Sequence, residues 1–154
     1  MLLLLACLFT LHCDDDDVIV GGTGPFSLRF SLAADFQQYG GQRISWALLR
    51  SDNGEKLVAG RGTISPTTNP PFSVNTGNVM LFGVPHQVHY WIDSNIDGGT
   101  PGECDPVVRD DKGEIIESFD MQWIAPFGGV TDDLVFIAIH SPDRVQNVCD
   151  TFPF

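Results

Sequence analysis

Hydrophobic and polar residues alternate along much of the chain. Between residues 26 and 33, Phe and Leu occupy every second position, with Ser and Arg between them. A period of two places successive side chains on opposite faces of a β-strand, so this segment predicts a strand with one apolar face. Residues 43–50 and 55–64 predict two further strands. The dipeptide Asn53-Gly54 between them indicates a hairpin, because both residues tolerate a positive φ angle.

Further short strands are expected at residues 72–75, 78–82, 87–93 and 114–124. Residues 133–140 are nearly continuous in apolar residues, which is typical of a central strand. The Pro-rich segment 65–71 must be a loop, and no segment combines helical periodicity with capping residues. We therefore expect an all-β fold, a single antiparallel β-sandwich of seven or eight strands, immunoglobulin-like or prealbumin-like in type.

Two of these strands carry more specific expectations. Gly60 and Gly62 indicate either a β-bulge or a close backbone contact within residues 55–64. In residues 114–124 the alternation predicts one apolar face, formed by Ile115, Phe119, Met121 and Trp123.

Composition and charge bound the class of protein. The chain has 154 residues, of which 43% are hydrophobic and 18% charged, so it can form one folded domain with a sizeable core. Its formal net charge of −12 argues against nucleic acid or an anionic membrane surface as a partner.

The start of the chain has a different character. Its opening residues, MLLLLACLFTLHC, form an apolar run that is too short to span a bilayer as a helix and is typical of a secretory signal. We expect residues 1–13 to be a leader, residues 14–25 an acidic and Gly-rich tether, and residues 26–154 the β-sandwich domain.

A Cys that ends such a run and precedes acidic residues resembles the leader of bacterial lipoproteins, whose mature chain begins with a diacylglyceryl-Cys. The resemblance implies lipidation of Cys13, with Cys7 as the alternative because Leu4-Leu5-Ala6 precedes it. The protein would then lie in the cell envelope, periplasmic or at the cell surface, and would contact the membrane only through its lipid anchor. The alternative is a secreted protein that is cleaved near the same position.

Residues 88–98, VHYWIDSNIDG, begin as a strand and end in oxygen-bearing side chains. Asp93, Asn95 and Asp97 occupy alternate positions before Gly98, as in the first half of an EF-hand loop. The twelfth position of that loop requires a bidentate Glu, but here it is Cys104, and a strand enters the loop in place of a helix. An EF-hand is therefore not expected.

The loop is similar instead to the calcium loops of thrombospondin type 3 repeats. That resemblance implies calcium as the cofactor, with Asp93 and Asp97 as ligands and Asn95 as a neutral oxygen donor. Asp105 would be the distal carboxylate. Oxygen ligands suit calcium better than a softer metal. The alternative is a solvated turn in which the Asp and Asn side chains bond their own backbone.

The same strand, together with the strand pair and the Gly-Val-Pro turn at residues 83–85 before it, resembles the prealbumin-like or Cna-B-like sandwiches of bacterial surface proteins. The resemblance covers residues 26–111. It implies the sandwich fold.

Cys104 and Cys149 are the Cys residues that remain outside the leader, and an even number outside the cytoplasm predicts one disulfide. This bond would pin the acidic loop to the C-terminal segment. Free or metal-binding thiols are the alternative, although the chain has no Cys-x-x-Cys pair.

Candidate chemistry outside the acidic loop is sparse. His86 and His89 are three residues apart in an extended segment and therefore point to opposite faces, while His140 is expected at the end of a strand. No Gly-x-Ser-x-Gly elbow or Gly-rich phosphate cradle is present. A small hydrolase would need one of these His residues in a pocket with an acid and a nucleophile.

The function expected from these features is non-catalytic. We expect a binding or structural module of the cell envelope with a calcium-stabilised loop, and its partner would be a protein or glycan at the cell surface. The principal alternative is a carbohydrate-binding module with a stacking platform of aromatic residues, although core packing is their more frequent fate. The candidate aromatic residues are Trp46, Tyr90, Trp91 and Trp123.

Overall fold

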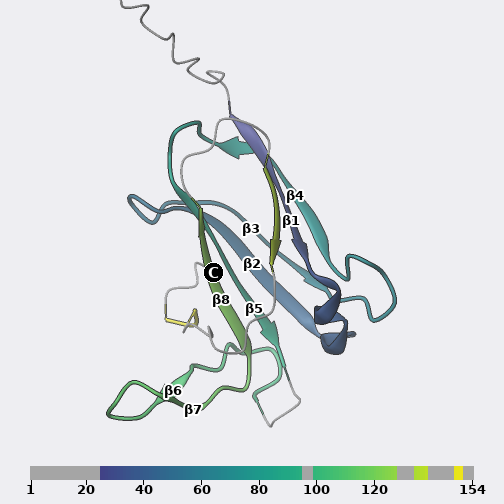
Figure 1. The fold of residues 1–154 in the computed structure, drawn as a ribbon, viewed down its shortest axis with the longest axis vertical. Coiled ribbons are helices and arrows are strands. Elements are labelled where there is room, and N and C mark those ends of the chain that lie inside the picture. Colours follow the sequence, from purple (N-terminus) through teal and green to yellow (C-terminus); the bar gives the residue numbers. More distant parts are fainter. Residues whose placement is uncertain (1–24, 95–98, 128–133, 139–147, 151–154) are drawn as a thin grey trace, which may run out of the picture.

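The alternating segments form two β-sheets that pack face to face (Figure 1). The structure, a computed structural model, describes residues 25–94, 99–127, 134–138 and 148–150. The four-stranded sheet has the order β3-β2-β5-β8 and consists of β2 (Arg43–Arg50), β3 (Lys56–Thr63), β5 (His86–Asp93) and β8 (Met121–Phe127). The three-stranded sheet has the order β4-β1-β9 and consists of β1 (Phe26–Leu32), β4 (Ser73–Met80) and β9 (Leu134–Ala138). The predicted all-β sandwich is confirmed.

Strands that are neighbours in these sheets run antiparallel, with one exception. Strands β1 and β9 are parallel, with Phe30 opposite Phe136. The expected antiparallel arrangement therefore holds for the other described pairs of the two sheets.

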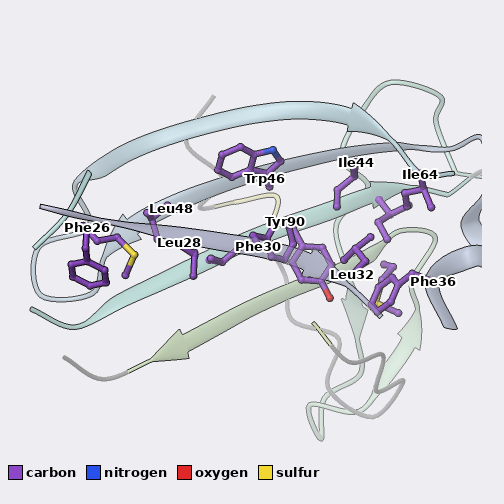
Figure 2. Packing of buried hydrophobic residues seen from close by; sticks show 14 residues of the cluster. Phe26, Leu28, Phe30, Leu32, Phe36, Ile44, Trp46, Leu48, Ile64 and Tyr90 are labelled. Atoms are coloured by element: carbon purple, nitrogen blue, oxygen red, sulfur yellow. The ribbon is translucent and has the colours of Figure 1, made fainter. Parts of the chain in front are cut away.

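The core lies between the sheets and follows directly from the alternation. The apolar residues of β1, such as Leu28 and Phe30, have no more than 4% of their surface exposed. They meet the inward residues of β2 and β5, and Figure 2 shows Phe30 beside Tyr90. The ring centroids of these two residues are 5.5 Å apart. Burial of each such side chain contributes about 1.5–3 kcal/mol relative to exposure.

A short 3-10 helix, η1 (Ala34–Tyr39), follows β1 and contributes to the same core. Its Phe36 is fully buried, and the ring packs edge-on against Tyr90 with centroids 6.2 Å apart. The sequence pattern does not predict this element because so short a helix cannot show a hydrophobic period.

The hairpin between β2 and β3 is confirmed, although only Gly54 of the expected dipeptide has a positive φ angle, +72°. Asn53 contributes through its side chain, because its Oδ1 accepts a hydrogen bond from the amide of Glu55 at 2.9 Å. At Gly60 and Gly62 the pairing with β2 is regular and close contact is the correct expectation, while the register shift of this pair lies between Leu48 and Leu49. A Cβ on Gly60 would lie 2.9 Å from the Trp46 ring, and one on Gly62 would lie 2.4 Å from the Phe72 ring.

Three strand predictions are wrong in detail. The separate strands at 72–75 and 78–82 are one strand, β4, whose register with β1 shifts where Gly77 has a φ angle of +72°. The expected central strand at 133–140 is β9, which lies at the end of the described strand order of its sheet. Its apolar run therefore does not indicate a central position.

The third correction concerns residues 114–124, which do not form one strand. They divide between β7 (Ile115–Glu117), which pairs with β6 (Val108–Arg109), and the start of β8. Ile115 is exposed in that hairpin and Phe119 belongs to no strand. Met121 belongs to the core and Trp123 packs against it. The predicted apolar face is therefore confirmed for these two residues and wrong for Ile115 and Phe119.

The central strands β2 and β5 are buried on both faces. A second cluster covers the outer face of the four-stranded sheet, where Val148 packs with Ala47, Leu49 and Trp91. Cys104 packs against the same cluster. We call residues 99–107 and 148–150 the cover segments, because they lie outside both sheets. Residues 99–105 of the first cover segment also form the far side of the acidic loop, and the second cover segment lies near the C-terminus in the sequence.

The described part of the chain includes no helix that is long and apolar enough to cross a membrane.

Candidate calcium-binding loop

The acidic loop begins where β5 ends. Asp93 is the last residue of that strand and lies opposite Arg43 of β2. Asn95 and Asp97, two of the predicted ligands, lie outside the described residues. The described part of the loop therefore consists of Asp93 and Ser94 on one side and residues 99–105 on the other.

Asp93 is buried, with 6% of its surface exposed. Its Oδ2 accepts a hydrogen bond from the amide of Gly102 at 2.8 Å, so the carboxylate ties the end of β5 to the far side of the loop. Its Oδ1 is also buried and has no hydrogen-bond partner among the described residues. A buried oxygen of this kind carries a desolvation cost that a hydrogen bond or a cation must offset.

Asp105, the predicted distal ligand, lies on the opposite side of the loop and is half-buried. Its Oδ2 accepts a hydrogen bond from the amide of Thr100 at 2.6 Å. Gly99 packs directly on this carboxylate, because a Cβ there would come within 2.6 Å of Asp105 Oδ2 and 2.9 Å of Phe119 Cβ. Any larger residue at position 99 would require Asp105 or Phe119 to shift.

Asp120, directly before β8, is a third carboxylate of the same cluster and was not among the predicted site residues. It is 2% exposed, and its two oxygens accept hydrogen bonds from the amides of Ser94 and Asp105, each at 2.9 Å. Asp120 therefore holds the two sides of the loop together. In the sequence it occupies a polar position of an alternating segment, where nothing distinguishes it from a solvent-facing residue.

The electrostatics of the cluster are unfavourable without a cation. Burial raises the pKa of Asp120 to about 6, although the amides of Asp105 and Ser94 act in the opposite direction. The negative charges of Asp105 and Asp93 raise this pKa further. The guanidinium of Arg43 lies close to the loop, because a Cβ built on Gly102 would be 3.6 Å from its Nη2. The ion pairs recorded among the described residues are nevertheless both made by Arg50.

The donor set fits a hard cation only in part. No group of three or more His, Cys, Asp or Glu among the described residues is arranged to hold a metal ion. Most carboxylate oxygens that could act as metal ligands already accept hydrogen bonds from backbone amides, as the turn interpretation predicts. Asp93 Oδ1 and Asp105 Oδ1 accept no amide of a described residue, and of these two oxygens Asp93 Oδ1 is the fully buried one. An oxygen of this type is a suitable ligand for calcium.

The two Cys residues lie at disulfide distance, as predicted. Cys104 and Cys149 have an S–S separation of 2.16 Å and connect the cover segments to each other. Gln122 of β8 connects the same segments to the sheet, because its Nε2 donates to the carbonyl of Asp105 and its Oε1 accepts from the amide of Val148. This fully buried Gln was missed by the sequence reasoning, since it alternates like an outward-facing residue.

The remaining candidates do not form a site among the described residues. His86 and His89 are both buried, and His140 lies outside the described residues, as do Cys7 and Cys13. Trp46 and Tyr90 belong to the core cluster. Trp91 is buried beneath Val148, and Trp123 packs against the core. These four aromatic residues therefore form no exposed stacking platform.

This arrangement offers oxygen ligands from a buried carboxylate and from a Gly-rich backbone. Such ligands suit calcium, which accepts six to eight oxygens in flexible geometry. No family model, curated protein or solved structure matches the chain.

Proposed function

We propose that the protein is a non-catalytic binding or structural module of the cell envelope whose acidic loop is stabilised by calcium. The observation that supports this most directly is Asp93 Oδ1, a buried carboxylate oxygen without a hydrogen-bond partner among the described residues. It lies at the first position of the loop in which the sequence predicts Asn95, Asp97 and Asp105 as further ligands. A cation would offset the desolvation of this oxygen.

The contribution of the ion would be electrostatic. Asp93, Asp105 and Asp120 share one small region, and the charges of the first two raise the pKa of the third. A bound divalent cation would lower this mutual repulsion and would join the end of β5 to the cover segments. When it is bound, calcium would supply a rigid loop and no chemistry of its own.

A non-catalytic role is supported by the placement of the His residues. His86 and His89 are buried within β5, and burial lowers the pKa of each side chain. A general base must reach its substrate, so these two residues are poorly placed for catalysis. A hydrolase would have to use His140 or a group of another kind.

The cell-envelope location rests on the leader and on the cysteines. A chain in which Cys104 and Cys149 lie at disulfide distance suits an oxidising compartment. We propose Cys13 as the lipidated residue and a surface protein or glycan as the partner of the module. Membrane contact would occur through the lipid alone.

Thermal unfolding in calcium and in chelator tests the loop. We expect calcium to raise the melting temperature, because a ligand that binds only the native state stabilises it by about 2.7 kcal/mol at a hundredfold excess over its dissociation constant. Magnesium should substitute poorly, because it demands a tighter octahedral shell.

Three variants make the calcium test specific. Asp93→Asn and Asp97→Ala should each abolish the response, while Asp111→Asn, which removes the same charge from an exposed turn, should retain it. Asn at position 93 can still accept the amide of Gly102, so loss of the response there would report on the metal. Identical melting curves of the wild type in calcium and in chelator would refute the calcium loop.

A further inference from the structure

A cavity of about 560 Å³ lies at the outer face of the three-stranded sheet. Its lining residues come from the end of β1, the start of η1, the loop at residues 65–71 and the start of β4, and Figure 1 shows the course of these elements. A volume of this size is typical of pockets that hold small molecules. Its polar lining consists of Arg29, Ser31, Asn69 and Ser73. Ala34 and Pro70 contribute to the apolar part of the wall.

Arg29 is the one charged residue among the described residues that line the cavity. Its side chain is exposed, and it makes no hydrogen bond or ion pair with any described residue. Arg50 behaves differently, because its guanidinium is 2.7 Å from Asp52. In a chain with 20 acidic and 8 basic residues, an arginine without an acidic partner among the described residues offers a cation to an anionic ligand.

Two hydroxyl groups add a donor beside this cation. Ser31 Oγ and Ser73 Oγ are 2.8 Å apart, and either can donate to the other. Each hydroxyl has one hydrogen, so whichever group accepts keeps its own hydrogen available for a third partner. Ser31 is only 6% exposed, which places a nearly buried polar group in the lining of the cavity.

We propose that this cavity binds a small carboxylate with an apolar body, either a free organic acid or the C-terminal residue of a peptide. Arg29 would pair with the carboxylate, and the hydroxyl pair would donate to one of its oxygens. Ala34 and Pro70 would contact the apolar body. This assignment does not depend on the calcium loop, since none of the cavity residues belongs to that loop.

The lining favours a carboxylate over other ligands. A single guanidinium balances a monoanion and can bind both oxygens of a carboxylate, whereas a phosphate dianion calls for more cationic charge. The described lining residues include no aromatic ring, so a sugar would find no stacking surface. The partly apolar wall would leave an inorganic anion with little contact.

An NMR shift titration of the full chain tests the proposal with three probes. The probes are 4-methylpentanoate, N-acetyl-leucine and the neutral N-acetyl-leucinamide. About 0.15 M salt is used because its Debye length of about 8 Å screens the rest of the negative chain. We expect both acids, but not the amide, to shift the amides of residues 29–34 and 69–73. Tighter binding of N-acetyl-leucine would identify the peptide terminus as the natural source, and tighter binding of 4-methylpentanoate the free acid.

Two arginine variants provide the matched comparison. Arg29→Gln should weaken binding of the acids by about tenfold or more, which is the loss expected for a charge-assisted pair. Arg61→Gln removes the same charge from an exposed position on β3 of the other sheet and should leave binding unchanged. Ser73→Ala should weaken binding less than Arg29→Gln and serves as a second variant if Arg29→Gln does not fold.

The proposal is overturned by any of three results. The wild type could show no shifts at millimolar acid, or the amide could bind as well as the acids. Arg61→Gln could also weaken binding as much as Arg29→Gln. Each of these results would mean that the cavity does not select a carboxylate through Arg29.

Discussion

At the scale of single residues, the polar groups of the four-stranded sheet explain how its outer face is organised. His89 is 3% exposed and lies between Ala47 and Ile124 in the sheet register. Neither of its ring nitrogens has a hydrogen-bond partner among the described residues. Gln122, by contrast, uses both ends of its amide to hold the cover segments. Burial of His89 without hydrogen bonds therefore destabilises the fold, and the apolar contacts around it offset this penalty. Gln122, in contrast, connects the two cover segments to β8.

His89 predicts how stability depends on pH. Burial lowers the pKa of His89 in the folded protein below the value near 6.5 of an unfolded chain. As the pH falls through about 6.5, the unfolded chain therefore takes up a proton that folded His89 does not, and the stability decreases. His89→Leu should lose less stability between pH 7.5 and pH 6 in urea unfolding, and it should be more stable at pH 7.5 by on the order of 1 kcal/mol.

Two other groups contribute to the same pH profile. His86 acts in the same direction, because burial lowers its pKa too. Asp120 acts in the opposite direction, because its raised pKa makes the folded state gain stability as the pH falls through about 6. Both are common to the wild type and to His89→Leu, so the difference between the two proteins isolates His89. Parallel pH profiles would contradict the prediction.

At the scale of elements, the cover segments bury the outer face of the four-stranded sheet. Strands β2 and β5 are buried on both faces because Val148 and the segment around Cys104 pack on the outside of the sheet. The disulfide, Gln122 and Asp120 all act on this one layer. The acidic loop and the C-terminal segment are therefore one structural unit, although 45 residues separate the two Cys residues.

The double variant Cys104→Ser/Cys149→Ser should keep the sandwich and loosen the cover segments. The chain-entropy estimate for a loop of 45 residues is about 4 kcal/mol of stability, and delivered values are commonly lower. Urea unfolding should show this loss, and acrylamide should quench Trp fluorescence more strongly because Trp91 lies beneath Val148. Reductant should destabilise the wild type and leave the double variant unchanged. Alkylation of both Cys104 and Cys149 in the folded, oxidised wild type would contradict the disulfide.

At the scale of the whole molecule, the sandwich carries two separate features, the acidic loop and the cavity beside Arg29, and the sequence predicts a leader before it. The first two lie on different sheets, which is why they can be tested independently. The net charge of −12 acts on all of them by favouring cations and opposing anions. An anionic ligand at Arg29 would therefore bind through local contacts and against the field of the chain.

Lipid anchoring is the prediction that concerns the whole molecule. The full chain made in a bacterium should partition with the membrane fraction and with a detergent phase. Cys13→Ser should release it to the aqueous phase, because the proposed lipid is the only part that inserts. Cys7→Ser is the matched control and should leave the partitioning unchanged. A soluble wild type whose N-terminus has been cut by a signal peptidase would contradict this prediction.

Local alternation was sufficient to predict most of the sandwich. A period of two depends only on neighbouring residues, so the strands at 26–32, 43–50, 56–63 and 86–93 were recognisable from the sequence. The disulfide pair followed from the number of Cys residues outside the predicted leader. Asp93 and Asp105 were recognisable as one loop because their spacing is local.

Only the tertiary structure decided which layer each strand and each polar residue belongs to. Residues 114–124 alternate throughout, yet one half is an exposed hairpin and the other half enters the sheet. Gln122 and Asp120 are buried because the cover segments fold back over β8, and that contact joins residues far apart in the chain. Arg29 and Ser73 share a cavity because β1 pairs with β4. Alternation reports which side chains share a face of a strand, whereas long-range packing determines what covers that face.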